Sequence, residues 1–582
     1  MRAAGGAASG GGLPVYRAEA VRQADRRAME MGTPGMTLME RAGAGAWRVI
    51  RRYLRGRPSA RVVVLAGRGN NGGDGLVVAR LAHAEGYPVA TLLLGRPGDL
   101  RGDAAEACRR AREAGVEIVP LDPDGGTPAE ILDLHLEQAD LVVDALLGTG
   151  GRGAPRGGFA EAIQAVNRWR ERRRERQHTG QPPGWGMVAA LDLPSGLDPD
   201  TGRAAGAVIA ADFTVTFGAL KTGLLMGPAL RFTGAVHLID IGLPAEAFPE
   251  PDAFLVTPAL VRSDLPPADP DAHKGSRGRV LVAAGSRGMS GAAILAARGA
   301  LRGGAGLVFA AVPAGERPVV ASAVPEALTI PLPEDEAGRP GPGAAEAILA
   351  WSPAPDAVVL GPGLGRSPAV TAAVLELMGR CPAPMVVDAD GLNALAGSDG
   401  EPDAPAGAAR GTQAAAPWPG PRVLTPHPGE AARLLGTTTG AVQQDRPAAA
   451  RELARRWGAV AVLKGARTLV AEPSGRLWII PTGSPALATG GTGDVLAGLI
   501  GALLAGGMAA PAAARTGAFL HGWAGQRLAR RWGTHGALAG DVPAAVARAR
   551  ALLARGGARE AADRRMLESC GIILEDAGDL GD

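Results

Sequence analysis

Aromatic side chains are scarce in this sequence, at 3% of residues, and the net charge is only +3 despite 61 basic and 58 acidic side chains. A nucleic-acid-binding face needs a broad basic stripe interleaved with stacking aromatics. The densest basic run, residues 168–176, also contains two glutamates and is typical of the solvated end of a helix. We therefore expect no nucleic-acid partner.

Cysteine is equally rare. Cys108, Cys381 and Cys570 lie far apart, and none belongs to a CxxC pair or to a Cys/His metal pattern. This spacing excludes a disulfide scaffold and a cysteine-ligated zinc site. Scattered cysteines are typical of reduced thiols, so we expect a cytoplasmic protein.

Long hydrophobic runs are few. Residues 1–12 lack the apolar core of a signal peptide. Val495–Ala514 is apolar enough to raise the question of a membrane helix, but it is rich in glycine and alanine, contains Pro511 and follows a glycine-rich loop. A buried core helix is the better interpretation, and we expect no membrane association.

Glycine and proline, in contrast, are plentiful, at 87 and 47 of the 582 residues. A chain of this length exceeds one ordinary core, so at least two domains are expected. Short apolar runs alternate with helical patterns, which indicates parallel α/β layers. Strands are predicted at 62–66, 89–94, 141–146, 187–191, 213–217, 236–241, 279–284, 307–312, 357–360, 385–388, 423–425, 460–463 and 469–471.

A Pro- and Asp-rich stretch, Leu243–Asp271, divides the chain. Glu171–Gly186 and Gly397–Gly420 are interpreted as inserted loops, and the second of them is of low complexity. We expect two domains and a tail, at 13–250, 257–556 and 557–582. The acidic end of the tail carries no motif that indicates a role.

Three polar clusters follow strands in the first half: residues 67–75, the run from Asp144 through 148–153, and residues 192–197. Ligands of a doubly wound sheet bind outside the carboxyl ends of its strands, so the clusters are expected to share one cleft. One such cluster alone could be ordinary turn or capping chemistry. Three in succession, with oxygen ligands but neither cysteine nor histidine, indicate a site for a hard cation rather than zinc.

Four motifs of this half, GNNGGDG at 69–75, DALLGTG at 144–150, DLPSGLD at 192–198 and TFGALKTG at 216–223, resemble those of the NAD(P)H-hydrate epimerases, over roughly 15–244. The resemblance implies a Rossmann-like fold that exchanges the R and S forms of the hydrate. It also implies a potassium ion bound by Asn71, Asp144 and Ser195. The implied contacts with the hydrate are Asn70, Asn71, Gly72, Gly73, Asp74, Gly148, Thr149, Gly150, Gly151, Arg152, Gly153, Ala154 and Asp192.

Exchange at the hydroxylated ring carbon needs a proton donor and a proton acceptor. Asp192 is the first candidate and Lys221 the second. Lys221 could equally be a structural ion-pair partner or a phosphate ligand, and the sequence leaves these alternatives open.

The second half contains the run ATGGTGD at 488–494, followed by the apolar VLAGLIGALLAG. The loop opens a long helix, whose free amides and dipole would stabilise charge on a transferring phosphoryl group. Asp494 stands where it could accept the proton of an attacking hydroxyl. A simple N-cap is the alternative for this aspartate, but the run of glycines before it favours the catalytic interpretation.

This loop resembles that of the ribokinase-like superfamily, and further motifs resemble those of the ADP-dependent NAD(P)H-hydrate dehydratases, over about 257–552. These motifs are HKGSRG at 273–278, GPGLG at 361–365, DADGLN at 388–393, TPHPGE at 425–430 and KGART at 464–468. The resemblance implies a ribokinase-like α/β domain that phosphorylates the ring hydroxyl with Mg²⁺ and ADP or ATP, and so turns it into a better leaving group. The implied contacts are Ala292, Gly365, His427 and Asp494 with the hydrate, and Lys464, Gly465, Ala466, Arg467, Thr468 and Gly493 with the nucleotide.

Two of these residues have alternative structural roles: His427 could be a turn or core histidine, and Lys464 could be a charge at a strand edge. The runner-up function is a ribokinase-like small-molecule kinase whose first domain only binds a cofactor. A nucleotide sensor would have lost Asp494 or the Asn-Asn-Gly-Gly-Asp loop, and both are intact. NAD(P)H hydrate and ADP or ATP are the expected ligands, and a homo-oligomer is the expected assembly.

Overall fold

The computed structural model describes residues 11–121, 129–151, 153–178, 186–267, 269–352, 354–397, 418–555 and 560–575. The chain divides into two compact units. The first comprises Met1–Ala253 and Arg564–Asp582, and the second comprises Phe254–Asp563. Within the described ranges, no helix is long and apolar enough to cross a membrane.

The first unit is built on a parallel sheet with the strand order β20-β9-β7-β6-β5-β2-β3-β4. Its members are β2 (Val62–Ala66), β3 (Val89–Leu94), β4 (Glu117–Leu121), β5 (Leu141–Ala145), β6 (Met187–Leu191), β7 (Phe213–Phe217), β9 (Ala235–Ile239) and β20 (Ile572–Leu574). From β4 to β7 this is the doubly wound order of a Rossmann-like fold, which reverses direction between β2 and β5. Short β1 (Leu13–Tyr16) and β8 (Leu220–Lys221) pair with each other in parallel.

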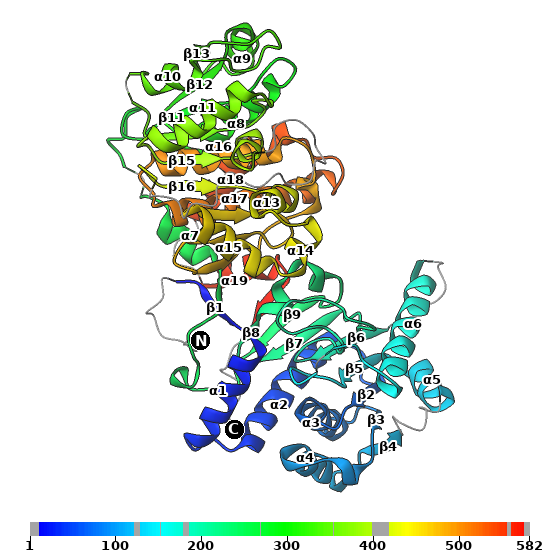
Figure 1. Ribbon diagram of the computed structural model, residues 1–582. Coiled ribbons are helices and arrows are strands. Elements are labelled where there is room, and N and C mark those ends of the chain that lie inside the picture. Colours follow the sequence, from blue (N-terminus) through cyan, green and yellow to red (C-terminus); the bar gives the residue numbers. More distant parts are fainter. Residues whose placement is uncertain are drawn as a thin grey trace. The chain divides into compact units, whose positions relative to one another are not determined.

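Helices cover both faces of this sheet (Figure 1). Successive side chains of a strand point to opposite faces, so Val62 and Val64 enter one apolar cluster while Val63 and Leu65 enter the other. Residues of α1, α2, α3 and α4 belong to the first cluster, and residues of α5 and α6 to the second. These helices are α1 (Ala18–Glu30), α2 (Gly35–Tyr53), α3 (Asn70–Ala84), α4 (Gly102–Glu113), α5 (Ala129–Gln138) and α6 (Gly158–His178).

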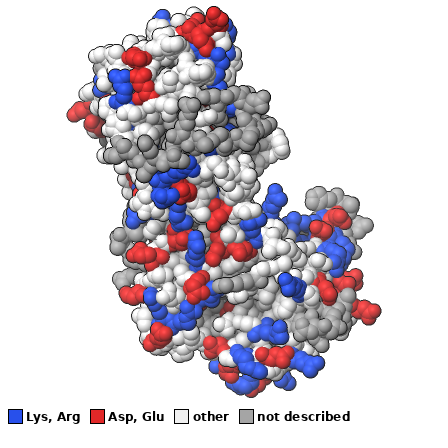
Figure 2. Space-filling model, viewed as in Figure 1, with Lys and Arg blue, Asp and Glu red and all other residues white. Residues whose placement is uncertain are grey.

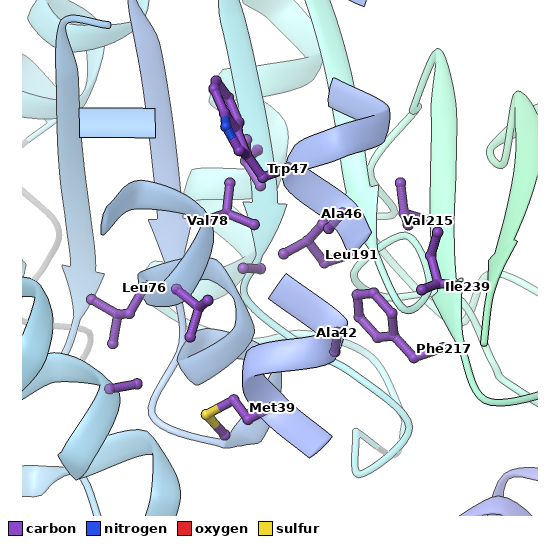
Figure 3. Packing of buried hydrophobic residues seen from close by; sticks show 14 of the residues in the cluster. Met39, Ala42, Ala46, Trp47, Leu76, Val78, Leu191, Val215, Phe217 and Ile239 are labelled. Carbon is purple, nitrogen blue, oxygen red and sulfur yellow. The ribbon is translucent and has the colours of Figure 1, made fainter. Parts of the chain in front are cut away.

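Helix α2 is the central helix of the first cluster. Its apolar face places Met39, Ala42, Ala46 and Trp47 between α3 and the strands, beside residues such as Leu191 (Figure 3). The small alanines let the helix approach the sheet closely, and all of these side chains are buried.

The tail returns to the first unit, which the sequence did not indicate. Strand β20 adds to the edge of the sheet in parallel with β9, with Ile572 opposite Val236. Glu575 then accepts a hydrogen bond from His237 at 2.7 Å and pairs with Arg52. The tail is therefore a structural part of the first unit's sheet.

Ile572→Ala should destabilise the first unit, because the side chain is fully buried. Removing three buried carbons of an isoleucine costs about 2–4 kcal/mol where the site cannot collapse. Hydrogen exchange of the full chain should then show faster exchange in β9. Ile573→Ala, at a half-buried position of the same strand, is the matched control and should change β9 less; equal effects of the two variants would contradict a stabilising role for the buried side.

The second unit contains strands in the order β13-β12-β11-β14-β15-β16-β17-β18-β19-β10. They are β10 (Ala253–Leu255), β11 (Arg279–Ala283), β12 (Leu307–Pro313), β13 (Leu328–Leu332), β14 (Ala357–Leu360), β15 (Met385–Val387), β16 (Arg422–Leu424), β17 (Val460–Leu463), β18 (Leu469–Ala471) and β19 (Leu477–Ile479). The strands are parallel except that β18 runs antiparallel to both of its neighbours. The α/β fold class expected for both halves is confirmed.

Helices again follow most strands of this unit (Figure 1). They are α7 (Pro258–Asp264), α8 (Ser290–Gly303), α9 (Arg317–Ala323), α10 (Ala344–Leu349), α11 (Pro368–Arg380), α12 (Asp390–Leu395), α13 (Pro428–Leu435), α14 (Thr439–Gln444), α15 (Arg446–Trp457), α16 (Thr492–Ala505), α17 (Ala510–Trp532) and α18 (Val542–Arg555). Helix α19 (Glu560–Glu568) crosses the division between the units.

The apolar stretch Val495–Ala514 is buried over residues 495–504, as expected, but it is exposed around Gly506 and Gly507, and it is not one helix. Helix α16 ends at Ala505 and α17 begins at Ala510, because Gly506 and Gly507 separate them. Helix α16 packs so closely on α8 that a Cβ at Gly498 would lie 2.0 Å from the carbonyl oxygen of Ala296. Glycine at this position is required by packing.

The interpretation of Glu171–Gly186 as a loop is wrong for its first half, because α6 continues to His178. Arginine, glutamate and glutamine favour helix, and one arginine of this run and another just before it are anchored. Arg170 and Arg174 pair with Asp212 at 2.6 and 2.9 Å. Most of Gly397–Gly420 lies outside the described residues.

Basic and acidic side chains are interspersed on the face of the molecule drawn in Figure 2. The small net charge thus reflects mixing of the two signs over this face.

Candidate active sites

The three polar clusters of the first half lie at neighbouring strand ends. Strand β5 lies between β2 and β6, and Leu65 of β2 pairs with Asp144 of β5, so the carboxyl ends of these strands are level. This is the point at which the strand order reverses, where doubly wound sheets bind ligands. A hollow of about 580 Å³ opens there. Its lining includes nine of the residues that the sequence analysis assigned to the site: Asn70, Asn71, Asp74, Gly148, Thr149, Gly150, Gly151, Asp192 and Lys221.

Other residues predicted to contact the hydrate lie elsewhere. Gly72 and Gly73 are packed against the protein, and a Cβ at Gly72 would lie 1.9 Å from the carbonyl oxygen of Gly67. Gly153 and Ala154 line an adjoining hollow of about 590 Å³. Arg152 lies outside the described residues.

Of the three residues expected to bind a cation, Asp144 is completely buried and contacts Ser195. Its carboxylate accepts hydrogen bonds from the Ser195 amide at 2.8 Å and from the Ser195 hydroxyl at 2.6 Å. Burial raises the pKa of Asp144 to about 6. Asn71 supplies a second buried oxygen, and both polar atoms of its amide lack a hydrogen-bond partner. A buried amide without partners and a buried carboxylate fit an oxygen-ligated cation.

Asp192 and Lys221 form an ion pair in the hollow, with Nζ and Oδ1 2.5 Å apart. The Lys221 ammonium also donates to the Thr216 hydroxyl at 2.9 Å and the Phe217 carbonyl at 2.8 Å, and its side chain is 1% exposed. Asp192 has a φ of +63°, a left-handed conformation that costs energy for a non-glycine residue. Strain at the end of a strand, in a residue that lines a hollow, is typical of functional sites.

Two residues of α1 that the sequence analysis missed also line this hollow, Arg22 and Asp25. Burial, with a smaller contribution from Asp192 that Lys221 opposes, raises the pKa of Asp25 to about 6. Burial likewise raises the pKa of Asp74 well above its usual value. No motif surrounds Asp25, so the sequence offered no signal for it beyond a polar residue in an amphipathic helix.

The second half presents its motifs at the carboxyl ends of adjacent strands. Leu360, Val387 and Leu424 pair in register across β14, β15 and β16, so these strands end together. The predicted site residues and two aspartates follow these strands at one edge of the sheet, in loops or in the first turns of helices. They are Ala292 after β11, Gly365 after β14, Asp388 and Asp390 after β15, His427 after β16 and Lys464 after β17.

Lys464 lies at the centre of this group. Its ammonium is 2.7 Å from an Asp388 oxygen and 3.8 Å from a Glu430 oxygen. Burial opposes the charge, but the carboxylates of Asp388 and Glu430 prevail and raise the pKa of Lys464. Lys464 is thus more than a charge at a strand edge, since it neutralises carboxylates that the sequence analysis had not assigned.

Asp494 is the third residue of α16, whose N-cap is Gly491 with a φ of +89°. The N-cap alternative for Asp494 is therefore wrong. Burial and the nearby Asp388 carboxylate raise the pKa of Asp494 to about 7, against the opposing effect of Lys464. A Cβ at Gly493 would lie 3.3 Å from the Lys464 ammonium, so the first turn of α16 lies close to that charge.

His427 caps α13, as one of its plainer alternatives expected. Its Nδ1 accepts hydrogen bonds from the amides of Gly429 and Glu430, at 3.0 and 3.4 Å. Burial and the charge of Lys464 lower the pKa of His427 to about 4. The side chain is still 52% exposed, so the ring can also contact a ligand.

The remaining predicted contacts differ in accessibility. The Gly365 amide donates to Asp390 at 2.9 Å, and Ala292 lies where a Cβ at Gly363 would come within 2.8 Å of its side chain. In the segment 464–468, Gly465 and Ala466 are exposed, whereas Arg467 is buried and donates to the Pro481 carbonyl.

Comparison with known proteins agrees with this division. Residues 35–223 match the family model described as YjeF-related protein N-terminus, and residues 280–547 match the model described as NAD(P)H-hydrate dehydratase. The bifunctional NAD(P)H-hydrate repair enzyme Nnr of Moorella thermoacetica is 43% identical over 89% of this chain and 93% of its own. The enzyme of the same name from Escherichia coli is 39% identical over 91% of this chain and 92% of its own.

The chain belongs to the family of bifunctional NAD(P)H-hydrate repair enzymes. The family expected from the motifs is thereby confirmed. Among solved structures, an ADP/ATP-dependent NAD(P)H-hydrate dehydratase from Bacillus subtilis, co-crystallised with ATP and Mg²⁺, is 30% identical over 51% of this chain and 98% of its own, with a TM-score of 0.44.

The packing of the first glycine loop in this family member can be tested by Gly72→Ala. An alanine inside a helix would gain about 1 kcal/mol from helix propensity. The clash of its Cβ with the Gly67 carbonyl should outweigh this gain, for a net loss of about 2–3 kcal/mol in urea unfolding. Gly150→Ala is the matched control, since nothing lies within 4 Å of a Cβ there, and it should change stability by about 0.5 kcal/mol or less. A stabilised Gly72→Ala protein would refute the packing argument.

Proposed function

We propose that this protein repairs NADH and NADPH that have taken up water. Its first unit interconverts the R and S forms of the hydrate, and its second unit dehydrates the S form with ADP or ATP. The observation that carries the proposal is Asp494, a carboxyl with a raised pKa at the start of α16, beside the Lys464–Asp388 ion pair. Family membership supports the choice of substrate.

Dehydration needs help because hydroxide is a poor leaving group. Asp494 accepts the proton of the ring hydroxyl as its oxygen attacks the terminal phosphorus of the nucleotide. The new phosphate then departs with the carbon–oxygen electrons, and the lone pair of the ring nitrogen drives its departure. The amides at the start of α16 and the helix dipole stabilise charge on the phosphoryl group.

In this proposal the hydrate contacts Ala292, Gly365, His427 and Asp494, whereas residues 464–468 and Gly493 hold the nucleotide. The exposed Gly465 and Ala466 offer backbone to it, while buried Arg467 holds the segment in place. Mg²⁺ carried by the phosphates supplies charge neutralisation there.

Epimerisation requires the carbon–oxygen bond to break on one face of the ring and to form on the other. Asp25, whose pKa is about 6, gives a proton to the departing oxygen, and Asp192 takes one from the incoming water. In the reverse direction the two carboxyl groups exchange roles. Lys221 holds Asp192 in place through their ion pair.

Asn71, Asp144 and Ser195 would hold a potassium ion, which would supply a fixed positive charge at the carboxyl end of β5. The unpartnered amide of Asn71 supports this assignment. A homo-oligomeric assembly and a cytoplasmic location remain predictions.

Incubation with NADH hydrate, Mg²⁺ and ADP tests the proposed function most simply. The absorbance of the reduced ring should return as the hydrate is consumed. Phosphorylation of a sugar or pyrimidine alcohol, without return of reduced cofactor, would favour the small-molecule kinase instead.

Asp494→Asn should abolish dehydration and leave epimerisation intact, because it removes the proton acceptor of one unit only. The kcat/KM for dehydration by the unsubstituted protein should fall about tenfold per pH unit below about 7, since a base must be deprotonated to act and burial raises the pKa of Asp494 to about 7. Loss of both activities in the variant, or a dehydration rate that is flat from pH 5 to 8, would contradict this assignment.

Asp192→Asn should slow the exchange of R and S hydrate at least a hundredfold and spare dehydration of the S form, because general acid–base groups contribute about 10²–10⁴ in rate. The exchange can be followed by chromatography of the two epimers. Glu113→Gln, an exposed carboxylate near the end of α4, is the control and should keep the original rate. An unchanged rate in Asp192→Asn would remove Asp192 from the mechanism.

A further inference from the structure

A second hollow of the first unit carries an unusual concentration of arginine. Arg48, Arg51 and Arg52 lie at i, i+3 and i+4 on one face of α2, and Arg55 follows just beyond the helix end. These four residues and Arg564 of α19 line a hollow of about 830 Å³. We call it the arginine hollow.

Two glutamates, Glu568 and Glu575, also line the hollow, and they are fewer than its five arginines. Arg51 pairs with Glu85 at 3.1 Å, and Arg52 pairs with Glu575. Within the described part of the chain, Arg48 and Arg55 form neither an ion pair nor a hydrogen bond through their side chains.

Structural reasons explain only part of this arrangement. Cations near a helix C-terminus interact favourably with its dipole, which suits one or two arginines. Like charges at i+3 and i+4, however, destabilise a helix. A set of guanidinium groups that converge on one hollow is instead suited to a multiply charged anion, because each planar fork matches two phosphate oxygens.

We propose that the arginine hollow binds the pyrophosphate group of a nucleotide. Its volume lies in the range that holds small ligands, and Tyr87 supplies an aromatic side chain at its wall against which a base can stack. A mononucleotide such as ADP and a dinucleotide such as NADPH share the required pyrophosphate.

This site is separate from the first active site. The N-terminal half of α2 lines the active-site hollow through Leu38 and Met39, whereas the arginine hollow begins at Arg48. The active-site hollow extends along α2 as far as Ala42, and at 1.5 Å of rise per residue Ala42 and Arg48 are about 9 Å apart along the helix axis.

Hydrogen exchange of the full chain localises the binding, because nucleotides also reach the two active sites. Inorganic pyrophosphate, ADP and NADPH are added separately, and exchange is followed in residues 47–57 and 564–575. All three probes should slow exchange in both segments. The probe that acts at the lowest concentration identifies the source of the pyrophosphate.

In the double variant Arg48→Gln, Arg55→Gln, the probe concentration that gives half of the maximal protection should rise at least tenfold. Exchange elsewhere in the first unit should stay as before. Arg112→Gln, an exposed arginine on α4, is the matched control and should leave the protection intact. Protection that is equal in the double variant and the unsubstituted protein, or the absence of protection by any of the three probes, would overturn the proposal.

Discussion

The strands of a parallel sheet all place their carboxyl ends at the same edge, and both candidate active sites of this protein depend on that constraint. In the first unit it brings the loop after β2, the loop after β5 and Asp192 after β6 to one hollow. In the second unit it brings Asp388, His427 and Lys464 together from successive strands. Segments far apart in sequence therefore meet at this edge because of the strand order alone, provided that the helices hold the strands in register.

Carboxyl groups gathered in this way repel one another, and in each unit one lysine offsets part of their negative charge. Lys221 pairs with Asp192, and Lys464 pairs with Asp388. One lysine does not neutralise every carboxyl group, so burial leaves the remaining ones with raised pKa values, among them Asp25 at about 6 and Asp494 at about 7. Groups that titrate near neutral pH are suited to transfer protons. The same electrostatic arrangement thus serves two different reactions.

Sequence motifs predicted most of this arrangement because apolar runs and glycine-rich turns report local structure. The long buried strands and the loops after β2, β5 and β6 were predicted at the right places, as was the placement of Asp494 in the first turn of a helix. Three features could not be predicted. Strand β20 is short and its partner lies over 300 residues away, Asp25 sits in a helix without a motif, and α6 continues through a run whose anchoring by Asp212 depends on tertiary contact.

The account depends most on the position of Asp494 relative to a bound nucleotide. A crystal structure of the full chain with Mg²⁺, ADP and a reduced dinucleotide would measure it directly. The account predicts that the terminal phosphate lies against the amides of 490–493, with the Asp494 carboxylate facing the space beside the phosphorus. A carboxylate turned into the protein interior, with the phosphate bound elsewhere, would contradict it.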